Sequence, residues 1–380
     1  MKQTILALIR PELNLSQPEN QRLHLIEHIL LSSERNMKIG ITQDKFAKDI
    51  LSSGGYITEL FCAEYYVVRS SAADSIKKII LSSSNNLHLE KVDLPAMKNV
   101  LIHELDEKKS QEIGIGEQFE KTIYHKKSPA LKQPWFEKKE LINLGKNKTD
   151  LDKIFKKYNS NQIFLELTFD EYNISKKISI KKNILSKTPK TINLTHPYQS
   201  PESSSINILL PKKLDENDLN KFLIYRTLLT DYYFGILYKE MREIGLIYDI
   251  SINYNKYFDS IQIYFSCSKN NTSEALNFIQ KFVEKDEIVS EKYLDLVKEK
   301  ISTNYELDWG DITNNSLFYI EEALLSKFYI SPKERVEKIK RVSSKEINDF
   351  HKGLRAESKN NLIITILNYG KKAEKMIDKK

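Results

Sequence analysis

The sequence predicts an α+β protein of two similar domains in tandem, each a mainly antiparallel sheet with helices packed on one face. The chain of 380 residues is long enough for two hydrophobic cores. Both halves repeat one order of elements: a strand, a helix, a pair of strands, several helices and a closing strand. A stretch rich in Ser, Thr, Pro and Asn separates them. We therefore place the first domain at 1–184, a linker at 185–205 and the second domain at 206–380.

In the first half, the apolar run at the start predicts a strand up to Pro11. Apolar residues at helical spacing predict a helix through residues 18–30, and a shorter helix begins near Thr42. The double glycine at 54–55 predicts a tight turn before one long strand at 56–69. The remaining predicted elements are helices at 71–83, 93–127 and 149–158 and a strand at 162–169.

In the second half, β-branched and aromatic residues predict four strands, and helical periodicity predicts five helices. The predicted strands are 206–210, 247–254, 260–267 and 362–367. The predicted helices are 216–243, 272–284, 290–305, 313–328 and 344–353.

Composition narrows the class of protein. The net charge of +7 is modest, and lysines alternate with acids, which does not favour a nucleic-acid-binding protein. The cysteines, Cys62 and Cys267, are far apart and lie in predicted strands, so we expect buried thiols and a reducing compartment. We find no signal peptide and no run of transmembrane length. The sequence therefore predicts a cytoplasmic protein with no membrane contact.

The predicted helix at 18–30 carries His24, Glu27 and His28 in the order H-x-x-E-H. At 3.6 residues per turn these side chains share one face of the helix. Two imidazoles one turn apart can reach the same metal ion, with a carboxylate beside them that need not ligate it. The alternative interpretation is a pair of buried histidines that only pack in the core. The helical context favours a zinc site.

Zinc held by two histidines needs a third protein ligand and an open position. Glu104 lies in a predicted helix and is the first candidate. Glu107, one turn later, is a second candidate, and Glu90 is a third. A lone glutamate on a helix is usually only solvated, so the residues alone leave this choice open.

Four separated segments together resemble the pitrilysin/insulinase family of metallopeptidases, and most closely its short two-domain members related to mitochondrial processing peptidase. The segments are HLIEH at 24–28, GGYITE at 54–59, VLIHE at 100–104 and YKEMREIGLIY at 238–248. They occur in the family's order, and the resemblance covers nearly the whole chain. It implies zinc held by His24, His28 and Glu104, with Glu27 as the general base.

The resemblance also implies how a substrate binds. A peptide would add as a strand at an edge that begins near Thr58, Glu59 and Leu60, so that main-chain hydrogen bonds give the affinity. In the second half, Arg242 and Tyr248 match residues that contact substrate and oxyanion in the family, with the Tyr248 hydroxyl as donor.

Three positions depart from the family pattern. Met97 stands where the family often has a second glutamate that supports the metal site. Thr58 and Glu59 replace an Asn-Ala pair. Arg242 lies six residues before Tyr248, where we expect seven. Members of the family often work in pairs, so we expect a homodimer or a heterodimer with a homologous subunit.

Two functions follow as expectations. The first is a zinc endopeptidase that cleaves short, unfolded peptides in an enclosed chamber, including maturation of a small precursor such as a bacteriocin-like leader peptide. The second is a non-catalytic or partner-dependent subunit of a peptidase heterodimer that serves as a scaffold. Metal analysis of the purified protein separates the two.

Overall fold

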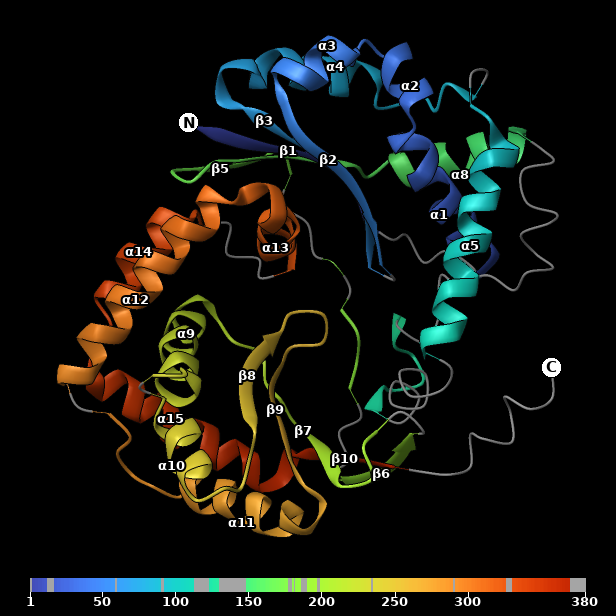
Figure 1. The fold of residues 1–380 in the computed structure, drawn as a ribbon. Coiled ribbons are helices and arrows are strands. Elements are labelled where there is room, and N and C mark those ends of the chain that lie inside the picture. The colour runs from blue at the N-terminus through green and yellow to red at the C-terminus, as the bar shows by residue number, and fades with distance from the viewer. Residues whose placement is uncertain are drawn as a thin grey trace, which may run out of the picture. The chain divides into compact units, whose positions relative to one another are not determined.

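The computed structural model has two compact units, and each unit is assembled from several stretches of chain (Figure 1). The first unit comprises Met1–Ile113, Lys127–Asn183 and Asp308–Lys333, and the second comprises Gly114–Lys126, Ile184–Leu307 and Glu334–Lys380. The structure describes residues 2–11, 17–58, 60–89, 92–112, 123–129, 148–176, 180, 182–185, 190–196, 199–233, 235–289, 291–325 and 330–369.

A five-stranded antiparallel sheet forms the centre of the first unit. Its strands are β1 (Gln3–Pro11), β2 (Ile50–Ile57), β3 (Phe61–Arg69), β4 (Ile163–Leu167) and β5 (Tyr172–Ile174). Their order in space is β2-β3-β1-β4-β5, so β2 lies at an edge. A hairpin joins β2 to β3, and β1 pairs with both β3 and β4.

Helices cover both faces of this sheet. Successive strand residues point to opposite faces, and the side chains on both faces are therefore buried. The helices from the first half of the chain are α1 (Gln17–Leu31), α2 (Ser33–Lys38), α3 (Gln43–Lys48), α4 (Ala73–Ser83), α5 (Leu94–Glu112) and α8 (Lys148–Asn159). The apolar residues of α1 pack with Cys62, Leu101 and Phe155. A helix from the second half, α13 (Ile312–Leu325), contacts β1, β2 and β3 on the side away from α3 and α4 (Figure 1).

The second unit has a sheet of the same design. Its strands are β6 (Lys190–His196), β7 (Ser203–Pro211), β8 (Asp249–Asn255), β9 (Ser260–Ser268) and β10 (Ile363–Tyr369). Their order is β6-β10-β7-β9-β8, with only the β6–β10 pair parallel among the described strands. Four strands therefore repeat the first sheet, since β8-β9-β7-β10 takes the order of β2-β3-β1-β4. The predicted fold class, α+β with two similar domains, is confirmed.

The helices of the second unit follow the predicted order with differences in their bounds. They are α9 (Glu216–Thr230), α10 (Ile236–Glu243), α11 (Thr272–Val283), α12 (Glu291–Gly310), α14 (Pro332–Lys340) and α15 (Ser344–Asn361). The single helix predicted at 216–243 is wrong, because α9 and α10 are separate. Asp231 ends α9 in an extended conformation and its carboxylate accepts a hydrogen bond from the Tyr233 N–H, while Gly235 caps α10.

The tight turn predicted at the double glycine is also wrong. Gly54 and Gly55 lie within β2, paired with Tyr65 and Glu64 of β3. The turn comes later, where the Thr58 hydroxyl accepts hydrogen bonds from the N–H groups of Leu60 and Phe61. Gly54 has no room for a side chain, because a Cβ there would lie 2.5 Å from the Tyr65 hydroxyl. These glycines therefore serve close packing and not chain reversal.

Several predicted elements differ in position or length from those in the structure. The range 185–205, predicted as a linker, contains strand β6, and helices α2 and α14 were not predicted. The helix predicted at 93–127 ends as α5 at Glu112, and 113–122 lie outside the described residues. The predicted domain limits at 184 and 206 stay a prediction.

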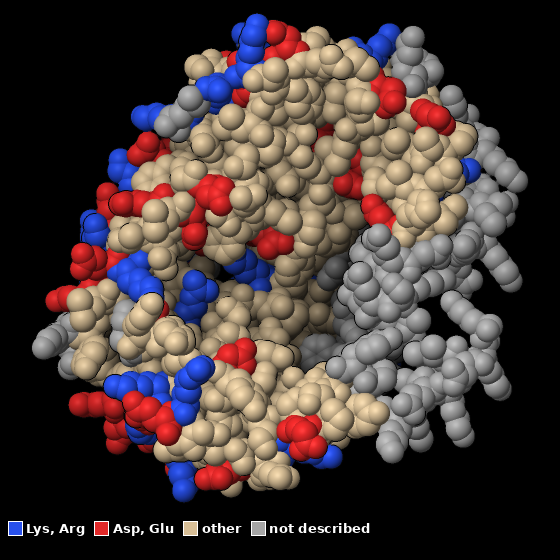
Figure 2. Space-filling view, in the orientation of Figure 1, with Lys and Arg blue, Asp and Glu red and all other residues tan. Residues whose placement is uncertain are grey.

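Two expectations about composition have structural counterparts. Cys62 in β3 and Cys267 in β9 are buried free thiols, as predicted. Within the residues that the structure describes, every helix is too short or too polar to cross a lipid bilayer. Lys and Arg are intermingled with Asp and Glu on the face shown in Figure 2.

Candidate metal centre

Helix α1 forms where apolar spacing predicted it and presents His24 and His28 one turn apart. Their ring centroids are 5.0 Å apart. Helical residues Leu25, Ile26 and Ile29 are buried against the sheet and anchor the helix. The His24 side chain is almost fully buried, and that of His28 is 18% exposed. The two imidazoles therefore share one side of α1, as the motif requires.

Helix α5 brings Glu104 to both histidines. The Nε2 atom of His24 lies 3.4 Å from Glu104 Oε2, and the Nε2 atom of His28 lies 3.4 Å from Glu104 Oε1. Ligand atoms of the three residues all lie within 4.8 Å of one another. Of the three glutamates considered for the third ligand, Glu104 is the one that the structure places here. Glu90 and the side chain of Glu107 lie outside the described part of the chain.

This donor set fits zinc. Zinc takes imidazole nitrogens and carboxylate oxygens at about 2.0–2.2 Å, so neighbouring ligands of a tetrahedral ion are roughly 3.3–3.5 Å apart. The two 3.4 Å distances, one to each oxygen of Glu104, both fall in that range. The Nε2 atom of His28 is also buried, and it forms no hydrogen bond with any residue that the structure describes. A cation at this position would give that atom a partner.

The electrostatics favour the neutral form of His28. Burial and the neighbouring His24 ring lower the pKa of His28, although Glu104 opposes the shift. A neutral imidazole has a lone pair for a metal, whereas an imidazolium has none. His28 is thus held in the form that ligates.

Glu27 lies beside the three donors without belonging to them. Its Oε2 atom is 3.6 Å from His28 Nε2, and its side chain is 10% exposed. Burial, reinforced by the Glu104 carboxylate, raises the pKa of Glu27 to about 8. A carboxyl group with a raised pKa next to a metal-ligand set is suited to accept and return a proton.

The edge strand β2 packs directly on Glu27 through Gly55. A Cβ at Gly55 would overlap Glu27 Oε1 and lie 2.5 Å from Leu31 Cδ1. Any larger residue here would require the side chains of Glu27 and Leu31 to shift, so the glycine allows them to keep these positions against the strand. Sequence reasoning missed this role, although a double glycine within a β-branched segment is a typical signal of close backbone approach.

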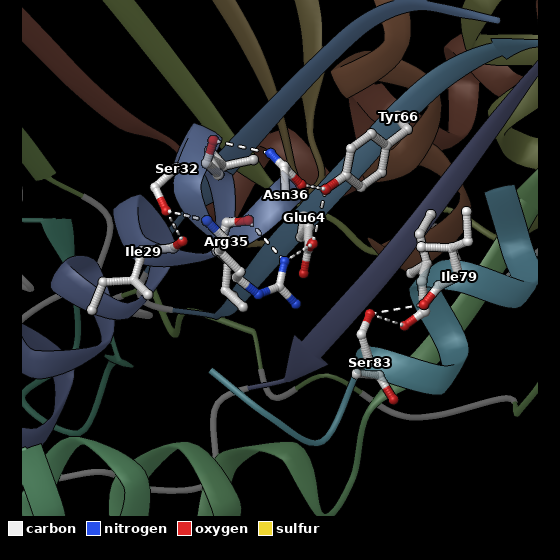
Figure 3. A network of polar contacts seen from close by, with 12 residues as sticks. Ile29, Ser32, Arg35, Asn36, Glu64, Tyr66, Ile79 and Ser83 are labelled. Atoms are coloured by element: carbon white, nitrogen blue, oxygen red, sulfur yellow. Dashed lines mark hydrogen bonds and ion pairs between the residues drawn. The ribbon is translucent and has the colours of Figure 1, made fainter. Parts of the chain in front are cut away.

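A buried polar network holds the C-terminal end of α1 (Figure 3). Arg35 donates one hydrogen bond to the Leu30 carbonyl and another to Glu64, both at 2.8 Å. The Asn36 amide donates to the Leu31 carbonyl at 3.2 Å. These donors satisfy carbonyls that the helix end leaves unpaired. The network fixes the last turn of the helix that carries the motif.

Glu64 is the centre of this network. It is buried in β3 between Arg35 and Arg10, which lies 3.4 Å from its second oxygen. Burial alone would raise the pKa of Glu64, but the two guanidinium groups outweigh it and hold the pKa below its ordinary value. The carboxylate therefore stays charged. Sequence reasoning did not identify Arg10, Arg35 or Glu64, because charged residues are rarely buried and nothing local marks their pairing.

The predicted substrate strand corresponds to the end of β2. Thr58 directly follows β2, and its hydroxyl is engaged in the turn. Leu60 has a buried side chain, so it offers only its backbone to a ligand. Glu59 lies outside the described residues.

In the second unit, Arg242 and Tyr248 come together in a different way from the prediction. The Arg242 guanidinium donates to the Tyr238 hydroxyl at 2.6 Å and to the main-chain carbonyl of Tyr248 at 2.7 Å. Tyr248 precedes the edge strand β8, and its side chain is 68% exposed. Arg242 therefore holds the backbone of Tyr248 and leaves the phenol ring in solvent.

Comparison with known structures decides the fold. No protein-family model matches the chain, and no curated protein matches its sequence. Solved structures do match. A protease from Helicobacter pylori has a TM-score of 0.64 at 12% identity, covering 97% of this chain and 94% of that chain. An M16-like peptidase from Alicyclobacillus acidocaldarius, described as putative in its source, has a TM-score of 0.63 at 12% identity, with 97% and 93% covered. The chain has the fold of the M16-like peptidases.

The M16-like fold also occurs without activity. The M16 inactive domain of a Pseudomonas fluorescens peptidase matches with a TM-score of 0.61 at 11% identity, covering 97% of this chain and 93% of that chain. The fold alone therefore does not distinguish a peptidase from a scaffold. That distinction depends on the side chains at His24, Glu27, His28 and Glu104.

Proposed function

We propose that the protein is a zinc-dependent endopeptidase that cleaves short, unfolded peptides. The observation that carries this proposal is the spacing of His24, His28 and Glu104, which suits one zinc ion in an M16-like fold. Three converging donors from two helices have no role in core packing, since burying polar groups without a partner costs free energy.

The chemistry needs a base, an electrophile and a positioned peptide. When bound, zinc would polarise the scissile carbonyl and lower the pKa of the attacking water. Glu27 accepts the proton of that water and returns it to the leaving amine. Burial of Glu27 and its contact with Gly55 hold the carboxylate in one place, so little reorganisation accompanies the proton transfer.

The edge strand β2 supplies the place for the peptide. Its outer side carries main-chain N–H and C=O groups without a neighbouring strand among the described residues. A peptide that adds there as a further strand lies next to Gly55, whose backbone packs on Glu27. Main-chain pairing favours extended, unfolded peptides and asks little of their sequence.

Other parts of the proposal go beyond the zinc unit. The Tyr248 hydroxyl is exposed and would donate to substrate, with Arg242 positioning its backbone. A homodimer or a heterodimer with a homologous subunit, an enclosed chamber, maturation of a leader-bearing precursor and a cytoplasmic location stay predictions.

A non-catalytic scaffold subunit is the second candidate. Met97, where the family often has a glutamate, packs partly buried against the apolar cluster behind α1 and offers no support to a metal ligand. The inactive M16 domain shows that this fold exists without activity in another protein. Purified protein without metal and without peptidase activity would favour this alternative.

The decisive test compares Glu27→Gln with the wild type and with Glu171→Gln, a control at an exposed carboxylate of the first unit. We expect Glu27→Gln to retain stoichiometric zinc by elemental analysis and to lose peptide hydrolysis by about 10²-fold or more, measured by mass spectrometry. Glu171→Gln should match the wild type. Full activity of zinc-loaded Glu27→Gln would overturn the mechanism.

A further inference from the structure

A polar pocket of about 380 Å³ lies in the second unit, apart from the residues that the proposed mechanism uses. It is lined by residues of α9, of the middle of α12 and of the edge strand β8, and by two residues that follow α9. The polar side chains that matter for its chemistry are Arg226, Asp231, Ser251, Asn253, Lys300 and Asn304. Its size is that of a site for a small ligand or a peptide side chain.

Arg226 is the distinctive group of this pocket. Its side chain is half-buried on α9, and it forms neither a hydrogen bond nor an ion pair with any residue in the described ranges. A guanidinium has five N–H donors and is always charged. Its N–H groups are not engaged by the described side chains, so they are available to an anionic ligand in the pocket.

The charge of the pocket is positive. Lys300 forms an ion pair with Asp231, whose side chain is buried. That pair is neutral, so Arg226 leaves a formal charge of +1. The uncharged polar groups of the lining include two exposed amides, Asn253 and Asn304, and a half-buried hydroxyl, Ser251. All three can donate hydrogen bonds to an anion.

We propose that this pocket binds a carboxylate group of a peptide. The planar fork of a guanidinium matches the two oxygens of a carboxylate. A single net charge of +1 with the Asp231 carboxylate in the wall favours a monoanion over a doubly charged phosphate. That the carboxylate belongs to a peptide rests on the proposed function, whereas the carboxylate site itself needs no zinc.

Two carboxylates occur in peptides, and the experiment separates them. Full-length protein treated with chelator is titrated with fluorescent, N-acetylated peptides of one length that contain only small neutral residues otherwise. One peptide has an internal Asp and an amidated C-terminus. The second has Asn in its place, and the third has Asn and a free C-terminal carboxylate. Fluorescence anisotropy gives the three dissociation constants.

The expected result is a dissociation constant at least about tenfold lower for one or both carboxylate peptides than for the neutral peptide. Tighter binding of the first peptide shows that the pocket takes an Asp side chain, and tighter binding of the third shows that it takes a C-terminus. Equal dissociation constants for all three peptides would overturn the proposal.

Two variants place the effect in the pocket. Arg226→Gln should abolish the preference for carboxylate, while Arg341→Gln, which removes the same charge from an exposed position of the second unit, should retain it. Asn304→Asp puts a negative charge at an exposed helical position of the rim and should also abolish the preference. It tests the site even where Arg226→Gln fails to fold. The assignment would be contradicted if the preference for carboxylate peptides survived in folded Arg226→Gln and Asn304→Asp. It would also be contradicted if the preference disappeared in Arg341→Gln.

The result is independent of the zinc proposal. Because the protein is metal-free in these titrations, binding measures the pocket alone. Selective carboxylate binding together with an inactive, metal-free native protein would retain the pocket and overturn the peptidase. An active Glu27-dependent peptidase with no carboxylate preference would do the reverse.

Discussion

The edge strand β2 approaches the proposed catalytic carboxylate closely at Gly55. No side chain fits between the strand backbone and Glu27. The same contact fixes the carboxylate and sets how near an added strand can come. The position of the proposed base and the position of the proposed substrate therefore both depend on Gly55.

Gly55→Ala is expected to reduce peptide hydrolysis by about tenfold or more while zinc content stays stoichiometric, because the new methyl group displaces Glu27 and not the ligands. Gly353→Ala is the matched control, since its Cβ would meet nothing within 4 Å. Steady-state kinetics and elemental analysis of both variants check this. Unchanged kinetics in Gly55→Ala would show that Glu27 does not need its present position.

Glu64 makes the stability of the first unit depend on pH. Its pKa is lowered in the folded protein, so the folded state binds this proton less readily than the unfolded chain. The stabilisation is fully present above the ordinary carboxyl pKa and is lost as the pH falls through the lowered pKa.

Glu64→Gln leaves two buried guanidinium groups without their counter-charge, which costs about 3–5 kcal/mol of unfolding free energy at neutral pH. We expect the difference between wild type and Glu64→Gln to stay constant from about pH 7 to about pH 5 and to shrink as the pH falls below the ordinary carboxyl pKa of about 4.3. Urea denaturation across this range measures it. A difference that is constant with pH would mean that the Glu64 charge does not contribute.

At the scale of elements, sequence patterns succeed where the determinants are local. The helix α1 is predicted because Leu23, Ile26 and Ile29 repeat at helical spacing. The break between α9 and α10 escapes prediction because it depends on the Asp231 carboxylate accepting from Tyr233, a contact without a periodic signature. Strand β6 escapes because its partner β10 is far away in the chain.

The candidate site follows the same division. His24, Glu27 and His28 are adjacent in sequence, so helical geometry alone brings them together. Glu104 reaches them from α5; the residues alone left Glu107 and Glu90 as alternatives, and only the family resemblance chose among the three before the structure. Arg35 and Glu64 act across the fold and had no signal in the sequence.

Helix α15 provides a test at this scale. Ser343 caps it in a reciprocal capping box with Glu346. Ser343→Ala should lower the unfolding free energy of the protein by about 1 kcal/mol, because an N–H at the helix start loses its acceptor. Chemical denaturation measures this change. Gly353→Ala in the same helix should raise the unfolding free energy by about 0.5–1 kcal/mol. A change of the same sign in the unfolding free energies of both variants would contradict these roles of Ser343 and Gly353.

At the scale of the molecule, four strands of each sheet share one order, yet the first unit is incomplete without a segment from the second half. Helix α13 contacts β1, β2 and β3. In β1, Leu6 and Leu8 belong to the apolar cluster with the first-half helices. The side chains of Ile5, Ala7 and Ile9 alternate with these two, so they point to the opposite face, and they too are nearly inaccessible to solvent. Their burial needs cover on that face.

A fragment of residues 1–205 is therefore expected to be poorly soluble or to bind a hydrophobic dye, because it lacks α13. Co-expression with a segment of residues 306–335 should restore a soluble, compact product, and a scrambled segment of equal composition is the control. Size-exclusion chromatography reads the result. A monomeric, cooperatively folding 1–205 fragment would show that α13 is dispensable.

The contribution of α13 also has a consequence for protein synthesis. The ribosome completes the first-unit segments up to Asn183 before it begins the one from Asp308. At about 5–20 residues per second, the intervening stretch takes on the order of ten seconds to translate. During that interval the nascent sheet has one uncovered apolar face. The unit that carries the candidate metal residues is thus finished late, and we expect it to depend on chaperones while the chain is still attached.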